Sequence, residues 1–262
     1  MNGKQGLILA VLLAITAAAG YLWWMQRTET ETAPVVVAAE TAAQQGSIAS
    51  PAAEAEPAIE HPLEATPAEP LPAVDDSDSV IGNAIARLIG ETQWRAFFYS
   101  DGLVRRIVAT VDNLPRHDAP VKMWPVHPVG SWFDTVAAGD GFIVGPNNAA
   151  RYARYVDLVK AVDAAKLAAV YRRLYPLFQQ AYRDLGFPKG YFNDRVVIAI
   201  DDLLATPELA EPLRLRQDKV RYQFADPDLD GRSAGQKIML RIGPENARIV
   251  KAKLREFRRA IG

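Results

Sequence analysis

"AAKLAAVYRRLYPLFQQAYRDLG", residues 164–186, is the stretch that decides the fold. Asp163 precedes it and has the short acceptor side chain typical of a helix N-cap. A long helix with one aromatic side must bury that side against other elements, so the stretch predicts a mainly α domain. The aromatic residues follow the four-three-four spacing of a single helical stripe: Tyr171, Tyr175, Phe178 and Tyr182.

Helices are also predicted on both sides of this stretch. On the N-terminal side, one helix is capped by Ser77 or Asp78 and ends at Gly90. A second carries an apolar stripe before Pro115, formed by Leu103, Ile107, Val111 and Leu114. On the C-terminal side, "FNDRVVIAIDDLLATPE" predicts a helix capped by Asn193, and two more helices meet at Gly243-Pro244.

The β-strand signal is weak and local. "GSWFDTVAAGDGFIVGP", residues 130–146, has two short apolar runs around a turn at Gly139–Gly141. A further strand is suggested only by "KVRYQF", residues 219–224. The prediction is a multi-helix globular domain with one small β-hairpin.

The N-terminal segment, residues 6–25, has the features of a transmembrane helix. It is uncharged and apolar, and twenty helical residues span roughly 30 Å, the thickness of a bilayer core. Lys4 precedes it, and after Arg27 no Lys or Arg occurs before Arg87, which favours a cytoplasmic N-terminus. A cleaved signal peptide is the alternative, because Ala17-Ala18-Ala19 fits the cleavage rule. The apolar run continues beyond that point, which favours an uncleaved anchor.

The segment that follows, residues 26–74, predicts a disordered linker rich in Ala, Pro and Glu. It has seven prolines, no aromatic residue and no periodic apolar face, so it lacks the apolar surface that folding requires. His61 is expected to be a solvated residue within it. The predicted organisation is therefore a cytoplasmic N-terminus (1–5), a transmembrane helix (6–25), the linker (26–74) and a mainly α periplasmic domain (75–262).

Four stretches together resemble a known family: "LVRRIVATVDNLPR", "YPLFQQAYRDLGFP", "FNDRVVIAIDDLLATPE" and "YQFADPDLDGRSAGQKIMLRIGPENARIVKAKLREFR". They are similar to the proteobacterial domain-of-unknown-function family 3014 (DUF3014) and cover most of residues 75–258. The resemblance implies a single-pass inner-membrane protein of the Gram-negative envelope. It implies no catalytic residue, cofactor or substrate. The chain departs from the family pattern at Gly231-Arg232, where the family has Ala-Leu-like residues.

The last of these stretches contains a partial calcium-loop pattern. Asp226, Asp228, Asp230 and Gly231 occupy positions 1, 3, 5 and 6 of such a loop. Position 12 is Lys237, a cation where a bidentate Glu is needed. We therefore interpret Asp226 as an N-cap followed by a helix that contains Gly231 and Gly235. These glycines predict close approach of another helix, for which the C-terminal helix is the candidate; the alternative is that Gly231 is simply tolerated.

Other candidate sites are weaker. His117 and His127, with Asp118, would suit an open metal site, but they are more simply loop residues. The chain has no cysteine, which excludes thiolate chemistry, and it has no recognisable nucleophile motif. We expect no cofactor and no metal. A carboxylate-based hydrolase acting on cell-wall glycan would use a pair among Glu91, Asp112, Asp194, Asp201 and Asp202.

The C-terminal helix carries the clearest candidate for a binding face. Its apolar seam is Val250, Leu254, Phe257 and Ile261. A face for an anionic partner is predicted from its basic residues: Arg248, Lys251, Arg255, Arg258 and Arg259. We expect a non-catalytic binding or scaffold module of the cell envelope, whose partner is an unknown envelope protein, glycan or lipid. Nucleic acid is not expected, because the domain is predicted to lie outside the cytoplasm.

Overall fold

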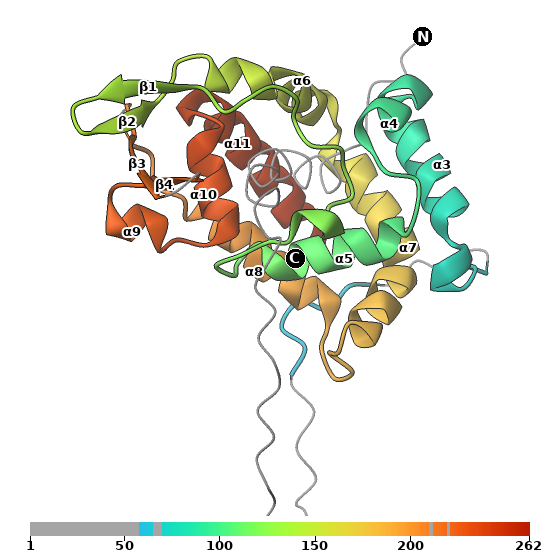
Figure 1. Ribbon diagram of the computed structural model, residues 1–262. Helices are drawn as coiled ribbons and strands as arrows, with labels where there is room; N and C mark the ends of the chain where they lie inside the picture. Colours follow the sequence, from blue (N-terminus) through green and yellow to red (C-terminus); the bar gives the residue numbers. More distant parts are fainter. Residues whose placement is uncertain (1–57, 65–69, 210–211, 219–220) are drawn as a thin grey trace, which may run out of the picture.

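The computed structural model describes residues 58–64, 70–209, 212–218 and 221–262. In this part the chain is mainly helical, with a small sheet on one side of the helical body (Figure 1). The predicted transmembrane segment and most of the predicted linker lie outside the described residues. Among the described helices, none is both long and apolar enough to cross a bilayer.

The N-terminal half of the helical body contains four helices in chain order: α3 (Asp78–Ile89), α4 (Glu91–Phe97), α5 (Leu103–Asn113) and α6 (Asn148–Ala161). Residues 98–102 separate α4 from α5. All four residues of the stripe predicted for α5 are buried. Short 3-10 turns, η1 (Val74–Asp76) and η2 (Val121–Met123), precede α3 and follow α5.

The helix predicted from residues 164–186 is α7 (Ala164–Asp184), and it packs against α5, α11 and α3. Asp163 caps it as predicted, because its carboxylate accepts from the Ala165 and Lys166 amides at 2.9 and 3.0 Å. Its aromatic stripe is fully inside the main core, where Tyr171 contacts Phe178 and Phe257. The stretch thus has the central position that its pattern predicts.

Four further helices complete the body: α8 (Phe192–Leu204), α9 (Pro227–Asp230), α10 (Ala234–Arg241) and α11 (Pro244–Ile261). The predicted boundary at Gly243-Pro244 is confirmed, and the whole apolar seam of α11 is buried. The Asn193 cap is wrong. Tyr191 is the N-cap position of α8, and Asn193 is a fully buried residue of the first turn. An amide at that position binds distant groups instead of its own helix.

The prediction of a single hairpin is also incomplete. Strands β1 (Thr135–Ala138) and β2 (Gly141–Val144) form the expected hairpin, but they belong to a four-stranded antiparallel sheet in the order β1-β2-β3-β4. Strand β4 (Arg221–Phe224) lies in the stretch 219–224 for which the sequence suggests a further strand, whereas β3 (Arg214–Asp218) is not predicted. Only Leu215 is buried among the five residues of β3. A strand with one buried side chain gives almost no alternation signal, which is why the sequence does not reveal it.

The predicted helix spanning Gly231 and Gly235 is in fact two helices. Gly231 ends α9, and Ser233 caps α10 by accepting from the Gln236 amide at 3.0 Å. The sheet, α9 and α10 enclose a small second core that includes Leu215, Phe224 and Leu240.

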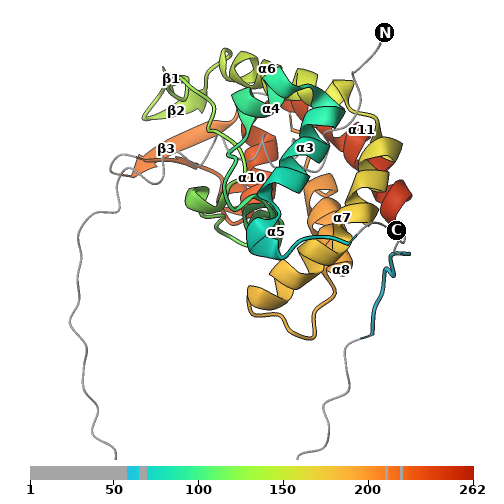
Figure 2. The same cartoon turned by 90° about the vertical axis from the view of Figure 1, so that its right-hand side faces the viewer.

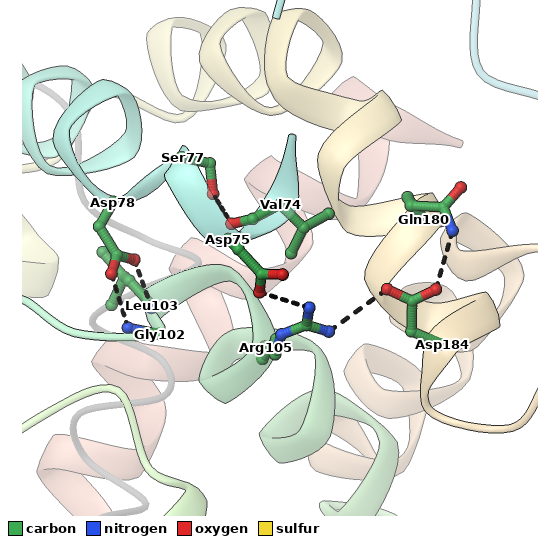
Figure 3. Close-up of polar contacts among 9 residues, drawn as sticks. All are labelled: Val74, Asp75, Ser77, Asp78, Gly102, Leu103, Arg105, Gln180 and Asp184. Carbon is green, nitrogen blue, oxygen red and sulfur yellow. Dashed lines mark hydrogen bonds and ion pairs between the residues drawn. The ribbon is translucent and has the colours of Figure 1, made fainter. Parts of the chain in front are cut away.

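Where the chain enters the helical body, a group of polar contacts joins η1, α3, α5 and α7 (Figure 3). Ser77 does not cap α3 with its side chain; its hydroxyl donates to the Val74 carbonyl at 2.6 Å. Asp78 caps α5 instead of α3, because its carboxylate accepts from the Gly102 and Leu103 amides at 2.8 and 2.9 Å. Arg105 bridges Asp75 and Asp184 at 2.6 and 3.3 Å.

Candidate functional site

The stretch with the calcium pattern forms a helix start. Asp226 caps α9 by accepting from the Asp228 amide at 2.9 Å, and Pro227 is the first helical residue. The Asp230 carboxylate lies 3.6 Å from Arg216 Nη2, and Lys237 donates to the Asp230 carbonyl at 3.3 Å. The N-cap prediction for Asp226 is confirmed. Within the described residues, no three His, Cys, Asp or Glu side chains are grouped closely enough to hold a metal ion.

The following residues fasten α10 to α8. Ser233 Oγ donates to Asp202 Oδ2 at 2.6 Å, and Gln236 Nε2 donates to Asp202 Oδ1 at 3.0 Å. Burial raises the pKa of Asp202, while these two hydrogen bonds act in the opposite direction. Gln236 takes the glutamine position of a capping box, but its side chain reaches Asp202 rather than the Ser233 amide. This stretch therefore has a structural role.

The predicted histidine group is divided between different neighbours. His117 is exposed, with Nδ1 3.2 Å from Asp118 Oδ2 and Nε2 3.4 Å from Lys237 Nζ. His127 packs edge-on against Tyr99, with ring centroids 4.2 Å apart. Neither arrangement gathers a set of metal ligands around the two imidazoles.

The five acids proposed for a hydrolase are each engaged by a partner of their own. Glu91 pairs with Arg95 at 2.7 Å, and Asp201 pairs with Arg258 at 3.1 Å. Asp112 lies between Arg116 and Arg195, whereas Asp194 accepts from the Glu60 and His61 amides. Asp202 is held by Ser233 and Gln236 as described above. No two of the five share a partner among the contacts of the described residues.

The basic face predicted on α11 is smaller than expected. Lys251 is only 4% exposed, and its ammonium donates to the Thr206 carbonyl at 2.5 Å, so it does not belong to the surface. Arg258 is half-buried against Asp201. The exposed members of the face are Arg248, which pairs with Glu245, and Arg255 and Arg259. Lys251 is buried because it directly follows Val250, a residue of the buried seam.

Residues 58–64 of the predicted linker dock on the start of α8, a contact that the sequence did not predict. The His61 amide donates to Asp194 Oδ1 at 2.7 Å, and the Leu63 amide donates to the Tyr191 hydroxyl at 2.8 Å. Asn193 Nδ2 donates both to the His61 carbonyl at 2.9 Å and to the Ile261 carbonyl at 3.1 Å. In Figure 2 the docked segment, in blue, lies just below the C-terminus. The segment binds mainly through its backbone, so the sequence of its side chains gives little indication of this contact.

A second arrangement that the sequence did not predict lies between α10, α6 and the sheet. Lys237 and Arg241 are one turn apart on α10, and the Arg241 guanidinium lies over the Phe224 ring, 5.3 Å from its centroid. Tyr152 of α6 is completely buried, and its hydroxyl has no hydrogen-bond partner in the described part of the chain. We call Lys237, Arg241, Tyr152 and Phe224 the α10 basic site.

Burial and neighbouring charges shift the pKa values of the three titratable residues of the α10 basic site. Burial lowers the pKa of Lys237, and the Arg241 charge lowers it further, against the opposing charges of Asp230 and Asp118. Burial also lowers the pKa of Arg241. Burial raises the pKa of Tyr152, so its hydroxyl keeps its proton at neutral pH and is a hydrogen-bond donor.

Comparison with protein-family models matches residues 103–258 to DUF3014, described as a protein of unknown function. The match begins at the first residue of α5 and ends within α11, so it includes the whole α10 basic site and the start of α8. A search of curated proteins and a search of solved structures each gave no match.

Proposed function

The chain belongs to the DUF3014 family of proteins of unknown function, and we propose that it is a membrane-anchored periplasmic module that binds an anionic component of the cell envelope. In this proposal residues 6–25 are the anchor, residues 26–57 are the spacer, and the helical body beginning at the docked segment is the binding head. The anionic component is a lipid surface, and the module catalyses no reaction.

The observation that carries the proposal is the position of the docked segment. Asn193 joins His61 in this segment to Ile261 at the end of α11. Arg255 and Arg259 are exposed on the last turns of the same helix. An anchored head would therefore have its attachment point and these two cations at the same end. Each cation close to an anionic membrane contributes about 1 kcal/mol of attraction.

The arrangement of the acids supports binding over hydrolysis of cell-wall glycan. Hydrolysis of a glycosidic bond requires two carboxyl groups that both face the sugar. Each of the five candidate acids instead holds a backbone amide, a basic side chain or a polar side chain.

Protease accessibility tests the membrane part of the proposal. The full chain would be expressed in a Gram-negative bacterium, and protease would be added to spheroplasts. We expect the head to be digested and an N-terminal epitope placed before residue 6 to survive. A head that resists protease until the inner membrane is lysed would overturn the proposed orientation.

Vesicle sedimentation tests the binding part. Residues 58–262, checked for helical content by circular dichroism, would be mixed with phosphatidylglycerol vesicles or with phosphatidylcholine vesicles. We expect sedimentation with the first only, lost in Arg255→Glu/Arg259→Glu. The matched control is Arg95→Glu, which reverses an exposed charge on α4. Equal sedimentation of the wild type and the double variant would contradict the proposed face.

A further inference from the structure

The α10 basic site places two positive charges next to each other. Lys237 and Arg241 are four residues apart on one helix, so their side chains are neighbours. Both are half-buried, and like charges at this spacing destabilise a helix. Water screens a half-buried pair less than a fully exposed one. The pair therefore needs a negative partner to be favourable.

Among the described residues, Asp230 acts on Arg241 through its charge alone, without a direct ion pair. Its guanidinium forms no hydrogen bond or ion pair within the described part of the chain, and its assigned contact is the Phe224 ring. Asp230 is the carboxylate on the neighbouring helix, and it pairs with Arg216. By contrast, Arg105 and Arg195 are hydrogen-bonded to carboxylates at 2.6 and 2.9 Å.

The third donor of the site is the buried Tyr152 hydroxyl. It has no hydrogen-bond partner of normal geometry in the described part of the chain, and the charges of Arg151 and Arg241 both act on it. A buried polar group without a partner has a free-energy cost that proteins normally avoid. Arg241, Lys237 and Tyr152 can all donate hydrogen bonds, and Lys237 uses only part of its capacity, on the Asp230 carbonyl and His117.

We propose that the α10 basic site binds a phosphate group. A guanidinium offers two parallel donors that fit two oxygens of an oxyanion, and an ammonium adds a third donor with a second charge. Two positive charges match a phosphate dianion better than a single carboxylate. The Arg241 guanidinium is also attracted to the Phe224 ring, whose centroid lies 5.3 Å away. This inference does not depend on the proposed membrane role, since it concerns α10 and the sheet rather than the end of α11.

Calorimetric titration of the purified full chain with inorganic phosphate, in a phosphate-free buffer at neutral pH, tests the site. We expect saturable binding that weakens by about tenfold or more in Arg241→Gln, because a charge-assisted hydrogen bond is lost. Lys237→Met should also weaken it, and Tyr152→Phe should weaken it less. Arg95→Gln, which changes an exposed arginine of α4 outside both proposed binding sites, is the control and should bind like the wild type.

Thermal unfolding without phosphate separates a ligand site from a structural one. If the cations serve a ligand, Lys237→Met should unfold at the same temperature as the wild type or higher, because a repulsion is removed. A lower unfolding temperature together with unchanged phosphate binding would overturn the proposal, as would the absence of phosphate binding to the wild type in every arm.

Two further titrations identify the source of the phosphate. Glycerol 3-phosphate represents soluble phosphate esters, and monomeric dihexanoyl phosphatidic acid represents a lipid headgroup. Binding of inorganic phosphate and glycerol 3-phosphate supports a soluble ligand. Binding of the lipid alone, lost in Arg241→Gln, supports a headgroup.

Discussion

At the scale of single residues, Gly235 shows how closely α8 and the end of α5 approach the main chain of α10. A Cβ atom at this position would lie 2.7 Å from Leu203 Cδ2 and 3.2 Å from the Leu114 carbonyl oxygen. The Gly235 amide donates to that same carbonyl at 2.9 Å. The close approach predicted from the sequence is therefore real, but the neighbours are α8 and the end of α5 rather than the C-terminal helix.

We expect Gly235→Ala to lower the free energy of unfolding by about 1–3 kcal/mol, because the added methyl group must displace Leu203 or lengthen a hydrogen bond. Urea denaturation followed by circular dichroism measures this change. Gly130→Ala is the matched control, since a Cβ there meets nothing within 4 Å. Equal midpoints for the two variants would show that α10 moves without cost.

At the scale of elements, a buried ion pair joins α5 to α8. The Asp112 side chain is 6% exposed and accepts from Arg195 Nε at 2.9 Å and from Arg116 Nη2 at 2.7 Å. The sequence offered Asp112 as a catalytic candidate because it could not show which helix would pack against α5. In the structure, this carboxylate connects α5 to α8.

We expect Asp112→Ala to lower the free energy of unfolding by about 3 kcal/mol or more, because Arg195 would be left partly buried without its partner. Thermal or urea unfolding of the variant provides the measurement. Glu91→Ala breaks the exposed pair with Arg95 and should change stability by less than about 1 kcal/mol. A loss for Asp112→Ala as small as for Glu91→Ala would mean that the buried pair contributes little.

At the scale of the whole molecule, the sequence predicts the helical body well and the contacts between its parts poorly. The stripe of α7, the Asp163 cap and the buried seam of α11 follow from local periodicity, and the family resemblance is confirmed. Strand β3, the docking of residues 58–64 and the α10 basic site depend on pairings between distant segments. Lys251 shows why local patterns do not predict such contacts, because its hydrogen-bond acceptor, the Thr206 carbonyl, is far away in sequence.

We expect Asp194→Ala to release the docked segment from the head of the full chain, because the Glu60 and His61 amides lose their acceptor. Hydrogen exchange followed by mass spectrometry should show faster exchange of the peptide containing these residues. Asp201→Ala is the control on the same helix, since Asp201 pairs with Arg258. Unchanged exchange in Asp194→Ala would show that these two hydrogen bonds do not hold the segment.

The shared hydrogen bonds of Asn193 also have a consequence for the topology of the chain. One side-chain amide bonds to the first described segment and to the next-to-last residue, so the path of the chain through the head is almost a closed circle. A short peptide joining residue 262 to residue 58 would complete that circle. New termini opened at the Gly139–Gly141 turn would then give a circular permutant in which every helix keeps its neighbours. A domain fused after residue 262 would, by the same geometry, emerge beside residues 58–64.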